Sequence, residues 1–579
     1  MTDVLTRPRP VPELHTPAAR LERGRRRFRA APVTYLICFA AYATTGLYLS
    51  VGRGLIIGDA LSRVADADFV LYSRQPHVAA VGFVFTPFTA LVQLPLVAIF
   101  HDSPWLLSHD VTGTLMAAAF MAGSVVQVAL IVSDRGRSAL WSYGVAALYA
   151  IHPMIVYYGG NGMSEAPFLF CVTWAVRRLL RWYNTDDVHD LIAVGIALGL
   201  AYLARYDALA AGGVAVAFVA VVSATRAGGG GAGRRLAARR RAGLMDATIV
   251  ALPIVLSFAL WTATSWLLTG DAFAQFSSVY GNTAILHYSE TATVSKASRL
   301  AFSLGEWLVL EPLLPLVLLA TAVLMIRRRD LEPLCPALVL GSVLGFQTYS
   351  YLGDSTFPFL RYYASAIPLV AVLIGMLLPA QGSVAARRRG RAARSPRPSR
   401  PLSTGARLGA LTVAAAVLAG GAVGSWLLMQ SPTRAPQEYA VAAALRPSTA
   451  SPEQEQLIAT FSTERQLAGY LDSLHLPDGS VITDTVFGFA VVVASHHPQQ
   501  FVIPSDRDFV TILNDPAAYG VQYILTVPPT GRGASDAVNR RYPNIYYDGG
   551  QISTLALEIP NDGADQPTWR LYHVIPQTG

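Results

Sequence analysis

Residues 33–51 read VTYLICFAAYATTGLYLSV, and residues 58–65, a short connection later, read GDALSRVA. The first segment carries no charged side chain, and its length is close to the roughly 20 apolar residues that a helix needs to cross a bilayer. The second segment opens with Asp59, and Arg63 follows four residues later, on the same face of a helix. This stretch therefore predicts a membrane span followed by a charged loop at the membrane boundary.

The composition extends this interpretation to most of the 579 residues. Hydrophobic residues make up 53% of the chain and charged residues only 14%, whereas a soluble domain carries about a quarter charged residues. This balance excludes a disordered chain, a fibrous repeat and an ordinary soluble enzyme. The three cysteines, Cys38, Cys171 and Cys335, all lie in apolar segments, so the sequence offers neither a disulfide framework nor a Cys/His metal site.

The fold class that the sequence predicts is a polytopic α-helical membrane protein with about eleven spans. Runs of basic residues alternate with the apolar segments, and such runs stay on the cytoplasmic side of a membrane. This rule predicts a basic cytoplasmic tail over residues 1–32, a transmembrane module over 33–429 and a C-terminus outside the cell. The predicted spans cover residues 33–51, 111–132, 139–158, 165–181, 190–204, 208–224, 247–268, 304–326, 333–351, 363–380 and 407–429.

The apolar stretch of residues 78–100 is long enough to span but does not fit this topology. Counting it as a span would place every later basic run on the wrong side of the membrane. It also contains Pro87 and Pro95, which interrupt a helix interior. We therefore expect it to form a re-entrant or surface-lying element of the first outer loop.

Residues 430–579 are predicted to form a soluble extracytoplasmic α/β domain. The segment has more acidic than basic residues, and its short apolar runs are separated by Gly, Pro and Asp. We expect one helix over residues 456–474. The expected strands cover residues 480–483, 490–493, 501–503, 523–527 and 553–557.

Charged and aromatic residues gather in the loops that this topology places outside the cell. Charged groups at membrane depth are costly and usually functional, so these residues are the candidates for a site. The candidates are Asp59, Arg63, Arg74 and His77 in the first outer loop, Glu165 in the second, Arg205, Tyr206 and Asp207 in the third, and Arg361 and Tyr362 at the start of a later span.

Each cluster also has a purely structural interpretation. The acid and the base of the first loop could form a surface ion pair, and Glu165 could cap a helix N-terminus, where an acid is favourable. Arg205 and Asp207 could pair locally in a helical hairpin, and Arg361 could extend its charge to the interface. The sequence alone leaves these alternatives open.

Carboxylates, arginines and tyrosines on one membrane face suit transfer of a group from a phosphorylated donor. A carboxylate can take a proton from a hydroxyl nucleophile, and arginine can hold a phosphate in a bidentate manner. We expect no metal and no cofactor, because two or more arginines can replace the charge of a metal. The predicted roles are base for Asp59, alternative base for Glu165, donor-phosphate binding for Arg205 and Arg361 with Arg63 and Arg74 in reserve, and substrate positioning for His77, Tyr206, Asp207 and Tyr362.

The order of features resembles the GT-C superfamily of membrane glycosyltransferases, which includes the protein O-mannosyltransferases, the aminoarabinose transferases and the actinobacterial arabinosyl- and mannosyltransferases. The resemblance rests on Asp59 in Gly-Asp-Ala, on Thr86-Pro87-Phe88 at the start of the apolar element, and on Glu165 in the second outer loop. It implies a multi-pass plasma-membrane enzyme with a polyprenyl-phosphate-linked sugar donor, a hydroxyl acceptor on a glycan or protein, and a first-loop carboxylate as base. A role in cell-envelope assembly would follow.

Two other classes of protein remain as alternatives. A transporter or lipid flippase would also be polytopic with buried charges, but it more often shows internal repeats and matching broken spans, which this sequence lacks. A non-enzymatic scaffold of the cell envelope is the second alternative. Clustered Asp, Glu and Arg residues on one face argue weakly against it.

Overall fold

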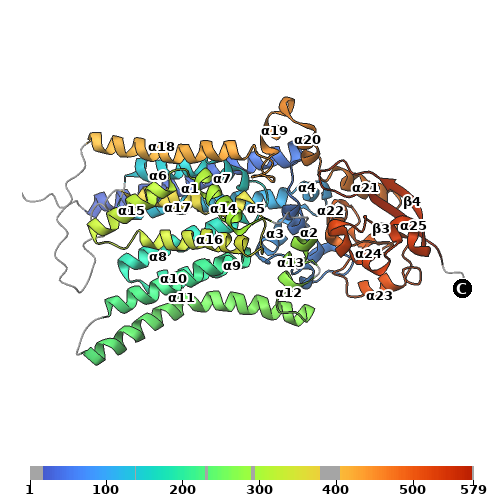
Figure 1. Cartoon of the computed structure of the whole chain (residues 1–579), viewed down its shortest axis with the longest axis horizontal. Helices are drawn as coiled ribbons and strands as arrows, with labels where there is room; N and C mark the ends of the chain where they lie inside the picture. The colour runs from blue at the N-terminus through green and yellow to red at the C-terminus, as the bar shows by residue number, and fades with distance from the viewer. Residues whose placement is uncertain are drawn as a thin grey trace, which may run out of the picture.

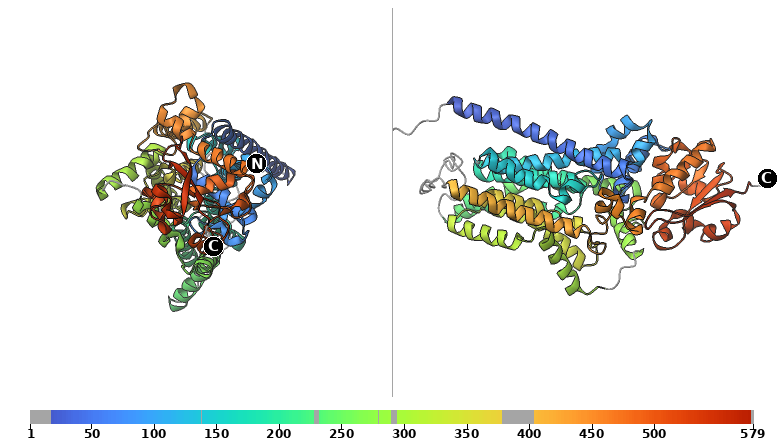
Figure 2. Two further views of the ribbon diagram at one scale, coloured as in Figure 1. Left: turned by 90° about the vertical axis from the view of Figure 1, so that its right-hand side faces the viewer. Right: turned by 90° about the horizontal axis from the view of Figure 1, so that it is seen from above.

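The computed structural model of the chain describes residues 17–136, 138–227, 232–278, 280–288, 294–377 and 404–576. Figure 1 shows a bundle of long helices with a mixed α/β domain at one end, and the same elongated arrangement is seen from above in Figure 2. The first 16 residues of the predicted basic tail and the Arg-rich loop around residues 387–403 lie outside the described residues.

The bundle is built from long apolar helices, and the neighbours α5, α8, α9, α10 and α11 pack side by side. Its core contains mostly small and aliphatic side chains. Its helices are α1 (Pro17–Leu47), α5 (Val111–Asp134), α6 (Ala139–Ala150), α7 (Pro153–Tyr158), α8 (Glu165–Thr185), α9 (Val188–Ala204), α10 (Ala208–Arg226), α11 (Ala232–Thr269), α14 (Lys296–Leu310), α15 (Leu314–Arg328), α16 (Leu334–Leu352), α17 (Ala366–Leu377) and α18 (Thr404–Leu428).

Each of the eleven apolar segments predicted as spans is largely helical over its described residues. By length and hydropathy, six of the described helices could each cross a membrane, and the pair α14 and α15, bent by 78°, would make a seventh. Several others are shorter or broken, as α6 and α7 are around Ile151. The chain is thus a helical protein with several membrane-spanning candidates, and the count of eleven spans stays a prediction.

Residues 78–100 form two short pieces rather than one span. A 3-10 turn, η2 (Val78–Val81), is followed by Gly82 with φ of +70° and then by α3 (Phe88–Phe100). A helix of 13 residues is about 20 Å long, which is shorter than the roughly 30 Å hydrocarbon core of a bilayer. Together with α2 (Gly58–Tyr72) and α4 (Pro104–Ser108), α3 lies between the bundle and the α/β domain (Figure 1).

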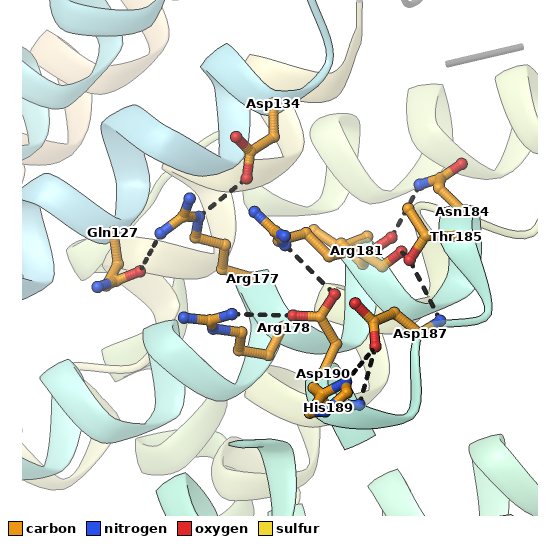
Figure 3. Close-up of polar contacts among 11 residues, drawn as sticks. Gln127, Asp134, Arg177, Arg178, Arg181, Asn184, Thr185, Asp187, His189 and Asp190 are labelled. Carbon is orange, nitrogen blue, oxygen red and sulfur yellow. Dashed lines mark hydrogen bonds and ion pairs between the residues drawn. The ribbon is translucent and has the colours of Figure 1, made fainter. Parts of the chain in front are cut away.

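One end of the bundle is held together by arginines and carboxylates, as Figure 3 shows. Arg178 and Arg181 of α8 both pair with the buried Asp190 of α9, at 3.0 and 3.3 Å. Arg177 reaches Asp134 at the end of α5, at 2.9 Å. We call this the basic end, and the opposite end, which carries the α/β domain, the domain end.

The α/β domain contains one five-stranded sheet in the order β2-β1-β3-β5-β4. The strands β1 (Val481–Ile482), β2 (Phe501–Val502) and β3 (Tyr523–Thr526) are parallel, whereas β4 (Ser553–Ile559) and β5 (Trp569–Val574) are antiparallel to each other, and β5 is antiparallel to β3. The flanking helices are α19 (Val441–Leu445), α20 (Pro452–Ile458), α21 (Ser462–Ser473), α22 (Thr485–Ala494), α23 (Phe509–Asn514), α24 (Ala537–Arg541) and α25 (Ile545–Asp548), and short 3-10 turns connect several of them.

Two predictions for this domain were wrong in detail. Residues 490–493 were expected as a strand but belong to α22, whose start is capped by Asp484 accepting from the backbone N–H of Val486. This helix makes the crossover from β1 to the parallel strand β2, which requires a helix rather than a strand. The helix expected over residues 456–474 is two helices, because the chain turns at residues 459–461 where Phe461 packs against Gly58. The strand β5 was not predicted.

The α/β domain is joined to the bundle by polar contacts as well as by packing of α22 on α2 and α4. Arg74, just after α2, pairs with Asp506 at 3.2 Å and also with Asp508. The side-chain amide of Gln499 donates to the backbone oxygen of Tyr72 at 3.0 Å. The domain is therefore seated directly on the first loop of the bundle.

The predicted orientation can be tested with single cysteines placed at the two ends, in a parent lacking Cys38, Cys171 and Cys335. His189 lies near the α8–α9 turn at the basic end, with its side chain 85% exposed, and Val510 of the α/β domain is 67% exposed. We expect an impermeant maleimide to label His189→Cys only after permeabilisation but Val510→Cys in intact cells. The reverse pattern would overturn the topology.

Candidate functional site

Asp59 lies in the first turn of α2, where the helix dipole favours an acid. The predicted pairing with Arg63 takes a different form, because the Arg63 guanidinium donates to the backbone oxygen of Asp59 and covers the ring of Phe85 at 4.1 Å. Arg63 is only 6% exposed, so the pair is not a surface ion pair. The carboxylate of Asp59 remains 38% exposed and turns toward a different arginine.

That partner is Arg361, from the 3-10 turn η3 (Leu360–Tyr363) before α17. Its Nη2 lies 2.8 Å from Oδ2 of Asp59, although the two residues are about 300 positions apart in the chain. The Arg361 side chain is 4% exposed and lies near the rings of Phe359 and Tyr362, each centred 5.2 Å from its Cζ. Arg361 is thus buried and paired, and does not extend to a water interface.

Glu165 and Arg205 continue the row of alternating charges. Glu165 begins α8 with its side chain 3% exposed, and its Oε1 lies 2.6 Å from Nη1 of Arg205 and 3.7 Å from Nε of Arg361. Arg205 also donates from Nε and Nη2 to Oδ2 of Asp207, at 3.0 and 2.9 Å. The order Asp59, Arg361, Glu165, Arg205, Asp207 forms one chain of ion pairs, which we call the charge row.

Three polar atoms of the charge row have no hydrogen-bond partner among the described residues. Oε2 of Glu165, Oδ1 of Asp207 and Nε of Arg361 are buried and make no hydrogen bond to a described residue. Buried polar atoms are normally satisfied. These atoms therefore favour a binding or catalytic role for the row over a purely structural one.

The second outer loop reaches the row because its glycines allow close approach. A β-carbon at Gly160 would lie 2.8 Å from the Cα of Gly46 in α1, and Gly162 has φ of +72°. The loop then brings Met163 against both Arg63 and Arg361, whose nitrogens lie 3.6 Å from its sulfur. The glycines of this connection thus allow Glu165 to lie deep among the helices.

Asp110, immediately before α5, is a buried acid that sequence reasoning missed. It is 1% exposed, and its carboxylate lies against Gly113 and Gly162, where a β-carbon would come within 2.1 and 2.3 Å of its oxygens. Burial raises the pKa of Asp110 to about 8, and Arg63 offsets only part of this rise. The one sequence signal for it is an acid that directly precedes an apolar span.

Asp59 has the opposite electrostatic environment. Burial alone would raise its pKa, but the positive charges of Arg361 and Arg63 outweigh this effect and hold the pKa of Asp59 below its usual range. At neutral pH Asp59 is therefore ionised while Asp110 is mostly protonated. Environments that separate the pKa values of neighbouring acids are typical of sites where one of them has a chemical role.

Tyr206 and Tyr362 both lie beside the charge row but have different neighbours. The ring of Tyr362 is centred 5.0 Å from the Cζ of Arg205 and contacts Arg361 as well, so it packs between the two arginines. Tyr206 instead lines a cavity of about 430 Å³, together with Phe276 of α12 (Ala274–Ser277) and residues of α13 (Asn282–Tyr288), α16 and the loop that follows α16, among them Phe346 and Gln347. The cavity thus adjoins the row through the Arg205–Tyr206–Asp207 segment.

Arg74 and His77 are not brought to the row. They follow the end of α2, and 15 helical residues from Asp59 correspond to about 22 Å. Arg74 is bonded to two carboxylates of the α/β domain, and Nδ1 of His77 lies 2.7 Å from the backbone oxygen of Gln75. Among the residues that the structure describes, no three His, Cys, Asp or Glu side chains are grouped so that they could hold a metal ion.

No known protein-family model matches this sequence, and no curated protein is similar enough to match. Among solved structures, the chain is similar to the archaeal oligosaccharyltransferase AglB from Archaeoglobus fulgidus in complex with an inhibitory peptide and a dolichol-phosphate. The TM-score is 0.37 and the identity 12%, over 94% of this chain and 75% of that one. A second match is the Archaeoglobus fulgidus oligosaccharyltransferase tethered to an acceptor peptide with an NVT sequon, with a TM-score of 0.37 and 11% identity, over 92% and 74% of the two chains.

Proposed function

We propose that this protein is a membrane glycosyltransferase that moves a sugar from a polyprenyl-phosphate donor to a hydroxyl acceptor at the outer face of the plasma membrane. The observation that carries the proposal is the pair of Asp59 and Arg361 at the start of the charge row. It places an ionised, partly exposed carboxylate beside a buried guanidinium at the domain end of an apolar bundle. A base and a phosphate ligand are the two groups that such a transfer requires.

In the proposed reaction, the acceptor hydroxyl gives its proton to Asp59 while its oxygen attacks the anomeric carbon. The bond between that carbon and the phosphate oxygen breaks, and the polyprenyl phosphate leaves as an anion held by Arg361 and Arg205. The leaving group is stable as an anion, so no strong acid is needed on that side. A single displacement inverts the configuration at the anomeric carbon.

Glu165 and Arg205 hold the Asp59–Arg361 pair in position. Glu165 is too deeply buried to be the first choice of base, but it fixes the two arginines relative to each other. Arg205 uses three of its five N–H donors on carboxylates, which leaves two for a phosphate. Asp207 and Tyr362 hold these side chains in place. Tyr206 lines the neighbouring cavity and would position a substrate there.

Asp59→Asn should lower turnover by roughly 10²-fold or more, because the amide keeps the shape but cannot accept the proton. The measurement is the level of polyprenyl-phosphate sugars in a deletion strain complemented with each variant, where an unused donor accumulates. Asp110→Asn is the matched control, since this acid is already mostly neutral at pH 7. Normal donor levels with Asp59→Asn, together with accumulation in Glu165→Gln, would move the base to the second outer loop.

The pH dependence should differ between free and donor-bound protein. In the free protein, Arg361 and Arg63 hold the pKa of Asp59 below its usual range, so the acid limb of kcat/KM should lie below the pH at which an ordinary aspartate titrates. A donor phosphate that shares Arg361 weakens this effect, so the acid limb of kcat should lie at a higher pH. Steady-state rates measured from about pH 2 to about pH 8 would show both limbs, and identical limbs for kcat and kcat/KM would contradict the prediction.

Arg361→Lys should weaken donor binding about tenfold or more, since the charge remains but the bidentate fork is lost. Donor KM and direct binding of the lipid-linked sugar are the measurements. Arg177→Lys, which alters a carboxylate-paired arginine at the basic end, should leave both unchanged. Unchanged binding in both Arg361→Ala and Arg205→Ala would remove these two residues from the donor site.

A further inference from the structure

The α/β domain presents the carboxyl ends of its parallel strands to the bundle. The chain adds β2 on one side of β1 and then β3 on the other side, which creates a topological switch point beside β1. Open sheets of this kind bind their ligands at the carboxyl ends of the strands next to such a switch point. The hydroxyl of Tyr280, in the loop before α13 of the bundle, donates to Asp484 directly after β1, at 2.7 Å. The edge where open α/β sheets take their ligands is therefore the edge that faces the domain end.

The segment after β3 leaves this same edge and carries Arg532. It forms the 3-10 turn η7 (Gly531–Ser535), which packs against α22 and α13. The guanidinium of Arg532 lies over the ring of Phe487 in α22, with its Cζ 5.2 Å from the ring centre. Because α22 in turn packs on α2, this one helix connects the η7 turn with the helix whose first turn contains Asp59.

The charge of Arg532 reaches Asp59. After burial, which raises the pKa of Asp59, the positive charges that lower it come from Arg361, Arg63 and then Arg532. Arg532 is thus part of the electrostatic environment of the row although it belongs to another domain.

The charge balance of the site leaves room for one more cation. Three arginines of the bundle, Arg63, Arg205 and Arg361, face three carboxylates, Asp59, Glu165 and Asp207. A bound phosphate would add a negative charge to a set that is already neutral. A further positive group would offset this added charge and strengthen phosphate binding beyond what Arg361 and Arg205 provide.

Arg532 has the properties of that group. Residue Arg532 lies at the surface, although partial burial of its guanidinium lowers its pKa. That guanidinium makes no hydrogen bond or ion pair to any residue in the part of the chain that the structure describes. Arg74, by contrast, is held by Asp506 and Asp508. The aromatic ring of Phe487 supports the guanidinium without neutralising it.

We propose that Arg532 binds the donor phosphate together with Arg361, so that the α/β domain completes the donor site of the bundle. This inference rests on the proposed glycosyltransferase function and deepens it. It gives the domain a direct part in substrate binding, and it identifies the ligand as a phosphate group at the membrane surface, where α22 joins η7 to α2.

Binding of undecaprenyl phosphate to the purified full-length protein in detergent micelles tests the proposal, with the phosphate-free polyprenol as the second probe. We expect Arg532→Gln to weaken binding of the phosphate about tenfold or more, as for loss of a charged hydrogen bond. Arg532→Lys should fall between this variant and the wild type. Binding of the polyprenol should be the same in all three.

Arg541→Gln is the matched control, because Arg541 is an exposed arginine of the same domain that bonds to Asn514 away from the bundle. It should bind undecaprenyl phosphate as the wild type does. Wild-type affinity in Arg532→Gln would overturn this inference alone. A wild-type protein that binds the phosphate no better than the polyprenol would overturn the proposed function together with it.

Discussion

The burial of Arg361 between two carboxylates is the constraint on which the domain end depends. A guanidinium taken out of water is tolerated only when it is paired, and breaking such a buried pair costs about 3–5 kcal/mol. To pair it, the structure must bring the start of α2 and the start of α8 to the same turn before α17. Arg205 extends the same requirement to the loop between α9 and α10. Four segments far apart in sequence are thus fixed by one row of charges.

The opposite end of the bundle uses the same residue types with a different result. There, Asp190 is shared by two arginines, and Glu332 pairs with Arg135 in a site where both side chains are 7% exposed (Figure 3 shows the Asp190 group). These arginines lie at helix ends, where basic residues orient helices in a bilayer. At the domain end the carboxylate of Asp59 keeps part of its surface open, and a cavity adjoins the row. The cavity beside the charge row has a volume of about 430 Å³, whereas the one lined by Arg135 at the basic end has about 10 Å³, so room for a ligand rather than charge or exposure distinguishes the two ends.

Sequence reasoning was strongest where a single local rule dominates. The apolar segments could be recognised because a lipid environment demands long apolar helices. Residues 78–100 are interrupted as expected, but only Pro87 lies at the interruption, at the start of α3, whereas Pro95 lies inside that helix and does not break it. It failed where partners are distant in sequence. Nothing in Phe359-Leu-Arg-Tyr-Tyr indicates that Arg361 meets Asp59, and the position of Asp110 against Gly162 depends on how two loops pack. Residues 490–493 show the converse case, since their β-branched composition favours a strand but the β1-to-β2 crossover imposes a helix.

The pairing of Asp59 with Arg361 also couples the two halves of the proposed reaction. While Arg361 is bound to Asp59, the carboxylate is a weak base, because the guanidinium stabilises its ionised form. A phosphate that binds Arg361 competes for the same N–H groups and returns basicity to Asp59. The base would then become effective only when a donor occupies the site, which limits the chance that Asp59 activates water or an acceptor in its absence. In the absence of donor, this ion pair would hold the surrounding segments together. When a donor binds, its opening would allow Asp59 to accept the proton of the acceptor hydroxyl.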